Sequence, residues 1–256
     1  MATVHDILQF LETLAPTSLK MDWDNVGLLC GSKSAKVTKV LVALDPFEGV
    51  CREAADMGAE LIVTHHPLIF QAPTAITNET SIGRAIMLLC QNGISAINAH
   101  TNLDCANGGV NDTLAAKLGL ADVQTVPGDN EQLLRFGQAK EQSLEDFLAN
   151  VKDTLGCQGL RFVSGNKPVS KVAVGGGSCA SAIPVVAAAG CDTFVTADVK
   201  YNQFWDAKDL GINLIDAGHF ATENPVVAVL AEKIAAQFPE IEVKISETHN
   251  DCMKFY

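Results

Sequence analysis

Two adjacent histidines, His65 and His66, are the residues of this chain best suited to bind a metal ion. They follow the short apolar run Leu61–Val63, which is typical of a strand, and Pro67 comes directly after them. Neutral imidazole is a good ligand for zinc, iron, nickel and copper. Because successive side chains of a strand point to opposite faces, both rings can reach one ion only if the strand ends by His65, which Pro67 favours. Taken alone, the pair leaves a metal site and two structural histidines equally open.

More candidate ligands occur further along the chain. His219 and Glu223 follow another apolar run, and their spacing of four residues puts both side chains on one face of a helical turn. An acidic residue near a helix start could instead complement the helix dipole. His100 and Asp104 follow a third predicted strand, at 94–99, and lie in a polar stretch that predicts a loop, where Asp104 could merely brace the turn.

Taken together, these candidates provide more ligands than one tetrahedral ion can bind. The set contains three imidazoles and two carboxylates: His65, His66, Asp104, His219 and Glu223. It suits two divalent ions bridged by a carboxylate and a water, a centre that generates hydroxide near neutral pH and is typical of hydrolases. Mixed nitrogen and oxygen ligands suit zinc, iron, manganese or nickel without selecting one. We expect the remaining histidines, His5 and His249, to be ordinary surface residues.

The elements that must position these residues alternate between strands and helices. The expected order is a strand at 40–44, a helix at 47–57, a strand at 61–63, a helix at 82–90 and a strand at 94–99. This order predicts a parallel sheet covered by helices, whose strands end at one ligand-binding edge. Asp45, the histidine pair and His100 follow three of these strands. Capping signals mark two other helix starts, at Thr3 and Ser143.

The second half of the chain repeats this alternation. The expected elements are strands at 172–174, 193–195 and 212–215 and helices at 180–189 and 204–210. We therefore predict an α/β fold with two similar halves, whose mainly parallel sheets face each other across a metal-containing cleft. A polar stretch at 121–131 marks the boundary. It gives a first unit at 1–124, with the candidate ligands up to Asp104, and a second at 125–256, with His219 and Glu223. A helix at 225–238 and a strand at 241–245 close the second unit.

Three other features each leave two interpretations open. The glycine-rich stretch Val174–Ser181 could cradle a phosphate, but it lacks the lysine of a P-loop, so tight packing of a strand against a helix is favoured. Asp198 and Lys200 could line the cleft, or Asp198 could cap the next helix. Trp23 is interpreted as a packing anchor rather than a ligand platform.

Composition limits the classes of function. A formal net charge of −12 argues against a nucleic-acid partner, although a local basic pocket could hold a phosphorylated small molecule. No apolar run is long enough to span a bilayer, and the chain start lacks the features of a secretory signal, so we expect no membrane partner and a cytoplasmic location. The eight cysteines form no C-x-x-C pair, which favours reduced core thiols over disulfides or a thiolate metal site.

Three motifs give the chain a resemblance to a known family. They are THHPLIF at 64–70, HTNLD at 100–104 followed by GGVN, and DAGHFATE at 216–223. They are similar to the motifs of the GTP cyclohydrolase I type 2 family, also called NGG-interacting-factor-3-like proteins. The similarity runs from Trp23 to the last helix, and it matches the short members that lack a central insertion.

The resemblance implies that the five ligand candidates bind two divalent ions, with Glu223 as the bridging carboxylate. His100 opens its motif without being one of the five, and it would orient Asp104 or, less in keeping with the pattern, carry a proton. The resemblance also implies a ring-shaped homohexamer assembled from dimers. The family name suggests a purine nucleotide substrate, with water attacking the imidazole ring of GTP. A hydrolase of another phosphorylated or cyclic small molecule stays open, as does a non-catalytic metal-binding assembly protein, because a fold does not fix a reaction.

Overall fold

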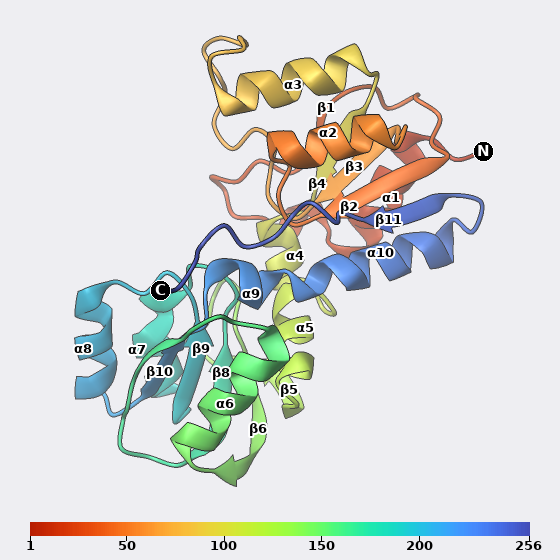
Figure 1. The fold of residues 1–256 in the computed structure, drawn as a ribbon. Coiled ribbons are helices and arrows are strands. Elements are labelled where there is room, and N and C mark those ends of the chain that lie inside the picture. Colours follow the sequence, from red (N-terminus) through yellow and green to blue (C-terminus); the bar gives the residue numbers. More distant parts are fainter. The chain divides into compact units, whose positions relative to one another are not determined.

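The computed structural model describes all 256 residues, which form two compact units. Unit 1 comprises Met1–Asn107 and Val227–Asn250, and unit 2 comprises Gly108–Val226 and Asp251–Tyr256. Each unit consists of one β-sheet flanked by helices (Figure 1). The predicted α/β class is therefore confirmed.

Unit 1 is organised around a five-stranded sheet of order β1-β4-β3-β2-β11. Its strands are β1 (Gly27–Cys30), β2 (Lys39–Ala43), β3 (Leu61–Thr64), β4 (Ser95–Asn98) and β11 (Glu242–Ile245). The four strands from β4 to β11 run parallel to one another, and β1 pairs with β4 in the antiparallel direction. The sheet is thus mixed but mainly parallel, and β3 and β4 are buried along their whole length, as strands covered on both faces are.

Helices cover both faces of the unit 1 sheet. They are α1 (Val4–Leu14), η1 (Thr17–Leu19), α2 (Glu48–Asp56), α3 (Ser81–Gln91), α4 (Thr101–Cys105) and α10 (Pro225–Gln237), the last of which begins in unit 2. Leu41 and Ile62 of the sheet pack against Leu89 of α3 in one core cluster. The predicted cap of α1 is confirmed, since Thr3 and Asp6 form a capping box.

The last strand joins the first unit. β11 pairs with β2 in parallel, with Val243 opposite Val40, so the C-terminal helix and strand belong to unit 1. The division predicted from sequence, at 124/125, assigned them to the second half instead. The compact units also divide earlier, between Asn107 and Gly108. Because β2 and β11 are about 200 residues apart in the sequence, no local sequence pattern predicts that they pair.

Unit 2 is organised around a six-stranded sheet of order β5-β6-β8-β9-β10-β7. Its strands are β5 (Ala121–Thr125), β6 (Arg135–Gln142), β7 (Arg161–Val163), β8 (Val169–Val174), β9 (Thr193–Thr196) and β10 (Asn213–Asp216). Only β8, β9 and β10 are mutually parallel. The other pairings are antiparallel, so the prediction of a mainly parallel sheet is wrong for this unit. β5 and β7 were not predicted because β5 is exposed throughout and β7 has three residues.

The helices of unit 2 are α5 (Val110–Lys117), α6 (Leu144–Leu155), η2 (Ala180–Ala182), α7 (Ile183–Ala188), α8 (Tyr201–Asp209) and α9 (His219–Glu223). The predicted start of α6 is confirmed, because the Ser143 hydroxyl accepts a hydrogen bond from the amide of Asp146. Phe147 of α6 and Phe194 of β9 are fully buried in two separate core clusters. No helix of either unit is both long and apolar enough to cross a bilayer.

Candidate metal centre

The strand before the histidine pair ends where the sequence predicts. β3 stops at Thr64, whose hydroxyl donates to the carbonyl of His66 at 2.7 Å. The amide of His66 donates to the carbonyl of Leu44 at 2.9 Å. Because the strand has ended, the rings of His65 and His66 need not point to opposite faces, and their centroids lie 4.8 Å apart.

His100 joins this pair, and the three rings are called the histidine cluster below. His100 follows the carboxyl end of β4 and is the residue directly before α4. Its ring centroid lies 5.2 Å from that of His65 and 5.4 Å from that of His66. One ring nitrogen of each histidine lies within 4.8 Å of the other two, so the cluster could hold a metal ion. The structure therefore places His100 with His65 and His66, although the resemblance did not include His100 among the five metal ligands.

An acceptor oxygen lies against the Nδ1 atom of each ring of the pair. The carbonyl of Ala99 is 2.9 Å from Nδ1 of His65, and a carboxylate oxygen of Asp45 is 2.7 Å from Nδ1 of His66. An acceptor at Nδ1 places the proton on that atom and leaves the Nε2 lone pair for a metal. Metal-binding histidines in proteins are commonly held in this way.

Asp24 holds His100 in the same manner. One of its carboxylate oxygens is 2.8 Å from Nδ1 of His100, and the other accepts hydrogen bonds from the amide and hydroxyl of Thr101. Burial acts to raise the pKa of Asp24, but the hydrogen bonds from His100 and Thr101 outweigh it and hold that pKa well below its ordinary value. The carboxylate therefore stays ionised and fixes the orientation of the His100 ring.

His249 contacts this region from the far end of the chain. Its Nε2 atom lies 2.8 Å from the second carboxylate oxygen of Asp45, and its side chain is 8% exposed. The prediction that His249 is an ordinary surface residue is therefore wrong, whereas His5 is exposed as expected. Burial acts to raise the pKa of Asp45, but the hydrogen bonds from His249 and His66 hold it well below its ordinary value.

Asp104 lies on a helix rather than in a loop. The predicted polar loop is wrong at this point, because 101–105 form α4, a helix too short to show an apolar period. Asp104 is buried, and its carboxylate oxygen Oδ1 lies 3.6 Å from Nε2 of His65. Bonds of about 2.0–2.2 Å to one tetrahedral ion place two ligand atoms about 3.4 Å apart. The separation of His65 and Asp104 is therefore compatible with a shared ion.

Two exposed aromatic rings adjoin the histidine cluster. Trp23 is 62% exposed, so its interpretation as a packing anchor is wrong. Its ring centroid lies 6.2 Å from that of His100 and 5.8 Å from that of Phe70, which is itself 50% exposed. Neither ring is required by the core of unit 1.

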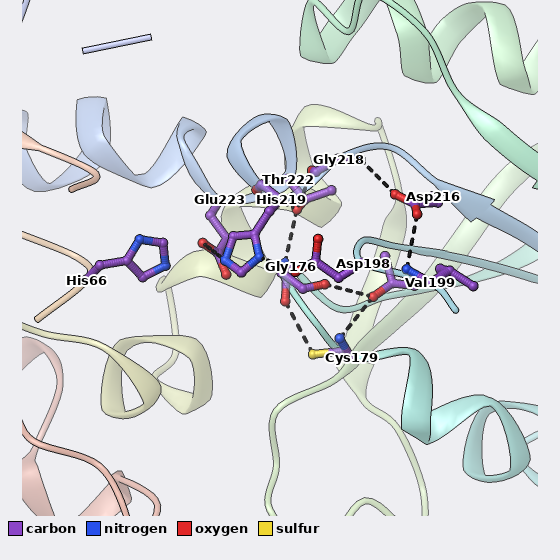
Figure 2. A network of polar contacts seen from close by, with 12 residues as sticks. His66, Gly176, Cys179, Asp198, Val199, Asp216, Gly218, His219, Thr222 and Glu223 are labelled. Carbon is purple, nitrogen blue, oxygen red and sulfur yellow. Dashed lines mark hydrogen bonds and ion pairs between the residues drawn. The ribbon is translucent and has the colours of Figure 1, made fainter. Parts of the chain in front are cut away.

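In unit 2, His219 and Glu223 occupy one face of α9, as their spacing predicts. Nε2 of His219 lies 3.0 Å from a carboxylate oxygen of Glu223 (Figure 2). Nδ1 of His219 lies 2.7 Å from a carboxylate oxygen of Asp198, which follows the carboxyl end of β9. Asp198 therefore orients this imidazole, and it does not cap α8, whose N-cap residue is Lys200. This pair repeats the carboxylate–histidine arrangement found in unit 1.

The glycine-rich turn packs directly against α9. The amide of Gly176 donates to the side chain of Asn111 at 2.7 Å, and the amide of Gly177 donates to the hydroxyl of Thr222 at 3.0 Å. A Cβ atom on Gly177 would lie 2.1 Å from a carboxylate oxygen of Glu223. These amides are satisfied within the protein, so the packing interpretation is confirmed. The glycine makes room for the Glu223 side chain.

Comparison with known proteins identifies relatives along nearly the whole chain. The sequence model of Duf34/NIF3 (NGG1p interacting factor 3) matches residues 2–252. A GTP cyclohydrolase 1 type 2 homolog of Clostridium perfringens is 37% identical, covering 98% of this chain and 99% of its own. The GTP cyclohydrolase 1 type 2 of Helicobacter pylori is 32% identical, covering 91% of each. The crystal structure of a Bacillus cereus protein related to NIF3 superimposes with a TM-score of 0.94 at 25% identity, covering 100% of this chain and 99% of that one.

Proposed function

Since the chain belongs to the Duf34/NIF3 (NGG1p interacting factor 3) family, we propose that it is a metal-dependent hydrolase. The observation that carries the proposal is the set of acceptor oxygens held against the histidine Nδ1 atoms, because this arrangement prepares each Nε2 atom for a metal. The proposed ligands are His65, His66 and Asp104 of unit 1 and His219 and Glu223 of unit 2. Glu223 would bridge two divalent ions, for which zinc, iron, manganese and nickel all suit the ligand atoms.

The ions, when bound, would supply hydroxide near neutral pH and polarise the bond under attack. The residues of the chain have separate tasks. Asp45 and Asp198 each accept a hydrogen bond at Nδ1 of His66 and His219, which fixes the two rings and leaves Nε2 as the atom that would bind a metal. A ring free to rotate would lose part of its binding energy to conformational entropy.

His100 is the proposed proton carrier. Its Nδ1 atom is paired with the ionised carboxylate of Asp24, which would stabilise the imidazolium formed when Nε2 takes a proton. Its other proposed role is to orient Asp104, which follows it on α4. The His100→Gln substitution separates the two roles. Loss of turnover with full metal occupancy supports proton transfer, whereas loss of an ion supports the orienting role.

The proposed substrate is a purine nucleotide or a related phosphorylated small molecule. This part rests on relatives named GTP cyclohydrolase 1 type 2, with which the chain shares about a third of its residues. We also propose a homo-oligomer, a hexamer by family resemblance, which light scattering coupled to size-exclusion chromatography would test. Nucleic acid is not a proposed partner, given the net charge of −12.

The test compares metal-free and metal-loaded protein for consumption of GTP, with other nucleotides and phosphoesters as parallel substrates. We expect turnover only in the metal-loaded protein. Asp104→Asn should abolish it, and the control His5→Ala, at an exposed histidine outside the site, should retain it. Metal-loaded protein that consumes GTP no faster than metal-free protein would refute the named activity. Full metal binding without turnover of any substrate would instead favour the non-catalytic metal-binding assembly protein.

A further inference from the structure

Trp23 and Phe70 form an exposed aromatic pair beside the histidine cluster. The two rings meet edge to face, with centroids 5.8 Å apart and an interplanar angle of 62°. Each also lies close to the ring of His100, with centroid distances of 6.2 and 6.3 Å. More than half of Trp23 and half of Phe70 are exposed to solvent. Exposed aromatic surface that is not needed by the core often marks a binding site.

The loops that carry these two rings are tied to each other. The side-chain amide of Asn25, two residues after Trp23, donates to the carbonyl of Ile69 at 2.6 Å, directly before Phe70. The side-chain amide of Asn98, at the end of β4, donates to the carbonyl of Asn25 at 3.0 Å. The position of one ring is therefore coupled to that of the other and to the edge of the sheet.

The Trp23 loop is also tied to the candidate metal ligands. Asp24, the residue next to Trp23, accepts hydrogen bonds from His100 and Thr101, and the amide of Met21 donates to the hydroxyl of Thr101 at 3.0 Å. A ligand that rests on the aromatic pair would thus sit at a fixed distance from the histidine cluster. Such preorganisation lowers the entropic cost of binding.

The charges around the aromatic pair narrow down the class of ligand. Lys20 is the only cationic residue of the segment 17–26, and its ammonium group donates to the carbonyls of Met21 and Asp24. The loop 66–80 that carries Phe70 contains no lysine or arginine. Apart from Lys20, whose ammonium group is held by these two carbonyls, the two segments offer aromatic faces but no lysine or arginine for a phosphate. Aromatic side chains bind planar heterocycles by stacking, largely independently of which base is present.

We propose that Trp23 and Phe70 form a stacking platform for the base of the substrate and hold a planar heteroaromatic ring beside the histidine cluster. This inference rests on the proposed function and assigns the base, rather than the phosphates, to this part of the site. It makes Trp23 and Phe70 specificity-determining residues for a ring-bearing substrate.

The test uses tryptophan fluorescence of the metal-loaded protein. The chain contains two tryptophans, Trp23 and Trp205, so Trp205→Phe leaves Trp23 as the only indole. Guanosine and GTP should quench its emission saturably, and ribose 5-phosphate, which has no base, should not. If neither guanosine nor GTP changes the emission, the platform is refuted whether or not GTP is consumed. Saturable quenching without GTP consumption leaves the platform standing and refutes GTP hydrolysis as the activity.

Kinetics and assembly provide the second readout. Trp23→Ala should raise the KM of a base-bearing substrate about 10- to 100-fold with little change in kcat, and Trp23→Phe should restore most of the loss. Trp205→Ala, at a tryptophan that is 50% exposed on α8, is the matched control and should leave both constants unchanged. An unchanged KM in Trp23→Ala together with a smaller oligomer would identify the pair as a contact between copies of the chain, which overturns the proposal.

Discussion

Replacing Gly177 by alanine should weaken metal binding although Gly177 is not itself a proposed ligand. A Cβ atom at this position would lie 2.1 Å from Oε1 of Glu223 and 3.1 Å from Nε2 of His219. Ordinary contact begins at 3.4 Å, so the carboxylate of Glu223 would have to move by about 1.3 Å. Displacements of this size around a metal ligand typically lower metal affinity about 10- to 100-fold.

The backbone makes a separate contribution, for which the chain offers a control. Gly177 has φ +63, and an L-residue in this region costs about 1–2 kcal/mol. Gly190 has φ +73, but the nearest atom to its added Cβ would be 4.0 Å away, on the Lys171 side chain. Both alanine variants should therefore lower the melting temperature by a few degrees. Only Gly177→Ala should lose metal affinity.

The assay is a competition titration of zinc against a chromogenic chelator, paired with thermal unfolding of the metal-free proteins. Wild-type zinc affinity in Gly177→Ala would refute the packing argument. An equal loss of affinity in Gly190→Ala would show that the backbone strain, and not the collision with Glu223, is responsible.

Three further predictions concern other parts of the chain. Asp198→Asn, which removes the charge that holds the imidazole of the α9 pair, should lower zinc affinity about 10- to 100-fold in the same chelator assay. Glu60→Gln should flatten the loss of stability below about pH 4.5. Burial acts to raise the pKa of Glu60, but hydrogen bonds from Thr38 hold it below its ordinary value of 4.5. The stability it contributes is therefore present above that pH and is lost as the pH falls through the folded pKa, a difference that urea unfolding at pH 3–7 would measure. Iodoacetamide should label the exposed thiol of Cys252 well before that of Cys51, whose pKa burial raises to about 12, and mass spectrometry that finds both labelled equally fast would contradict this.

The parts of the fold that could be predicted are those that depend on local sequence patterns: apolar runs, residue spacing and helix caps. Leu61–Val63 of β3 is a continuous apolar run, and Pro67 follows soon after its end, so the placement of the histidine pair at a strand end could be predicted. The spacing of His219 and Glu223 predicted their shared face on α9 in the same way. Capping residues such as Ser143 marked helix starts because their hydrogen bonds are made within one turn.

The residues that the sequence did not reveal are those whose partners are remote. Asp24 and His100 are 76 residues apart, and His249 and Asp45 are 204 residues apart. In the sequence, a carboxylate in a polar loop cannot be distinguished from a solvated surface residue, because its imidazole partner lies far away along the chain. Asp198 also reaches its partner only through the adjacency of two strand ends. The sequence could place Asp45 and Asp198 after predicted strands, but the histidine that each carboxylate orients had no signal in a single sequence.

The central claim is the proposal that the ligands assigned to unit 1 and unit 2 bind two ions per chain. Elemental analysis of the purified, metal-loaded chain tests it most directly, with His66→Ala representing unit 1, Glu223→Gln representing unit 2 and His5→Ala as the control. We predict two ions per chain in the wild type and the control, and the loss of at least one ion in each of the other variants. Full occupancy of both ions in either His66→Ala or Glu223→Gln would contradict the claim.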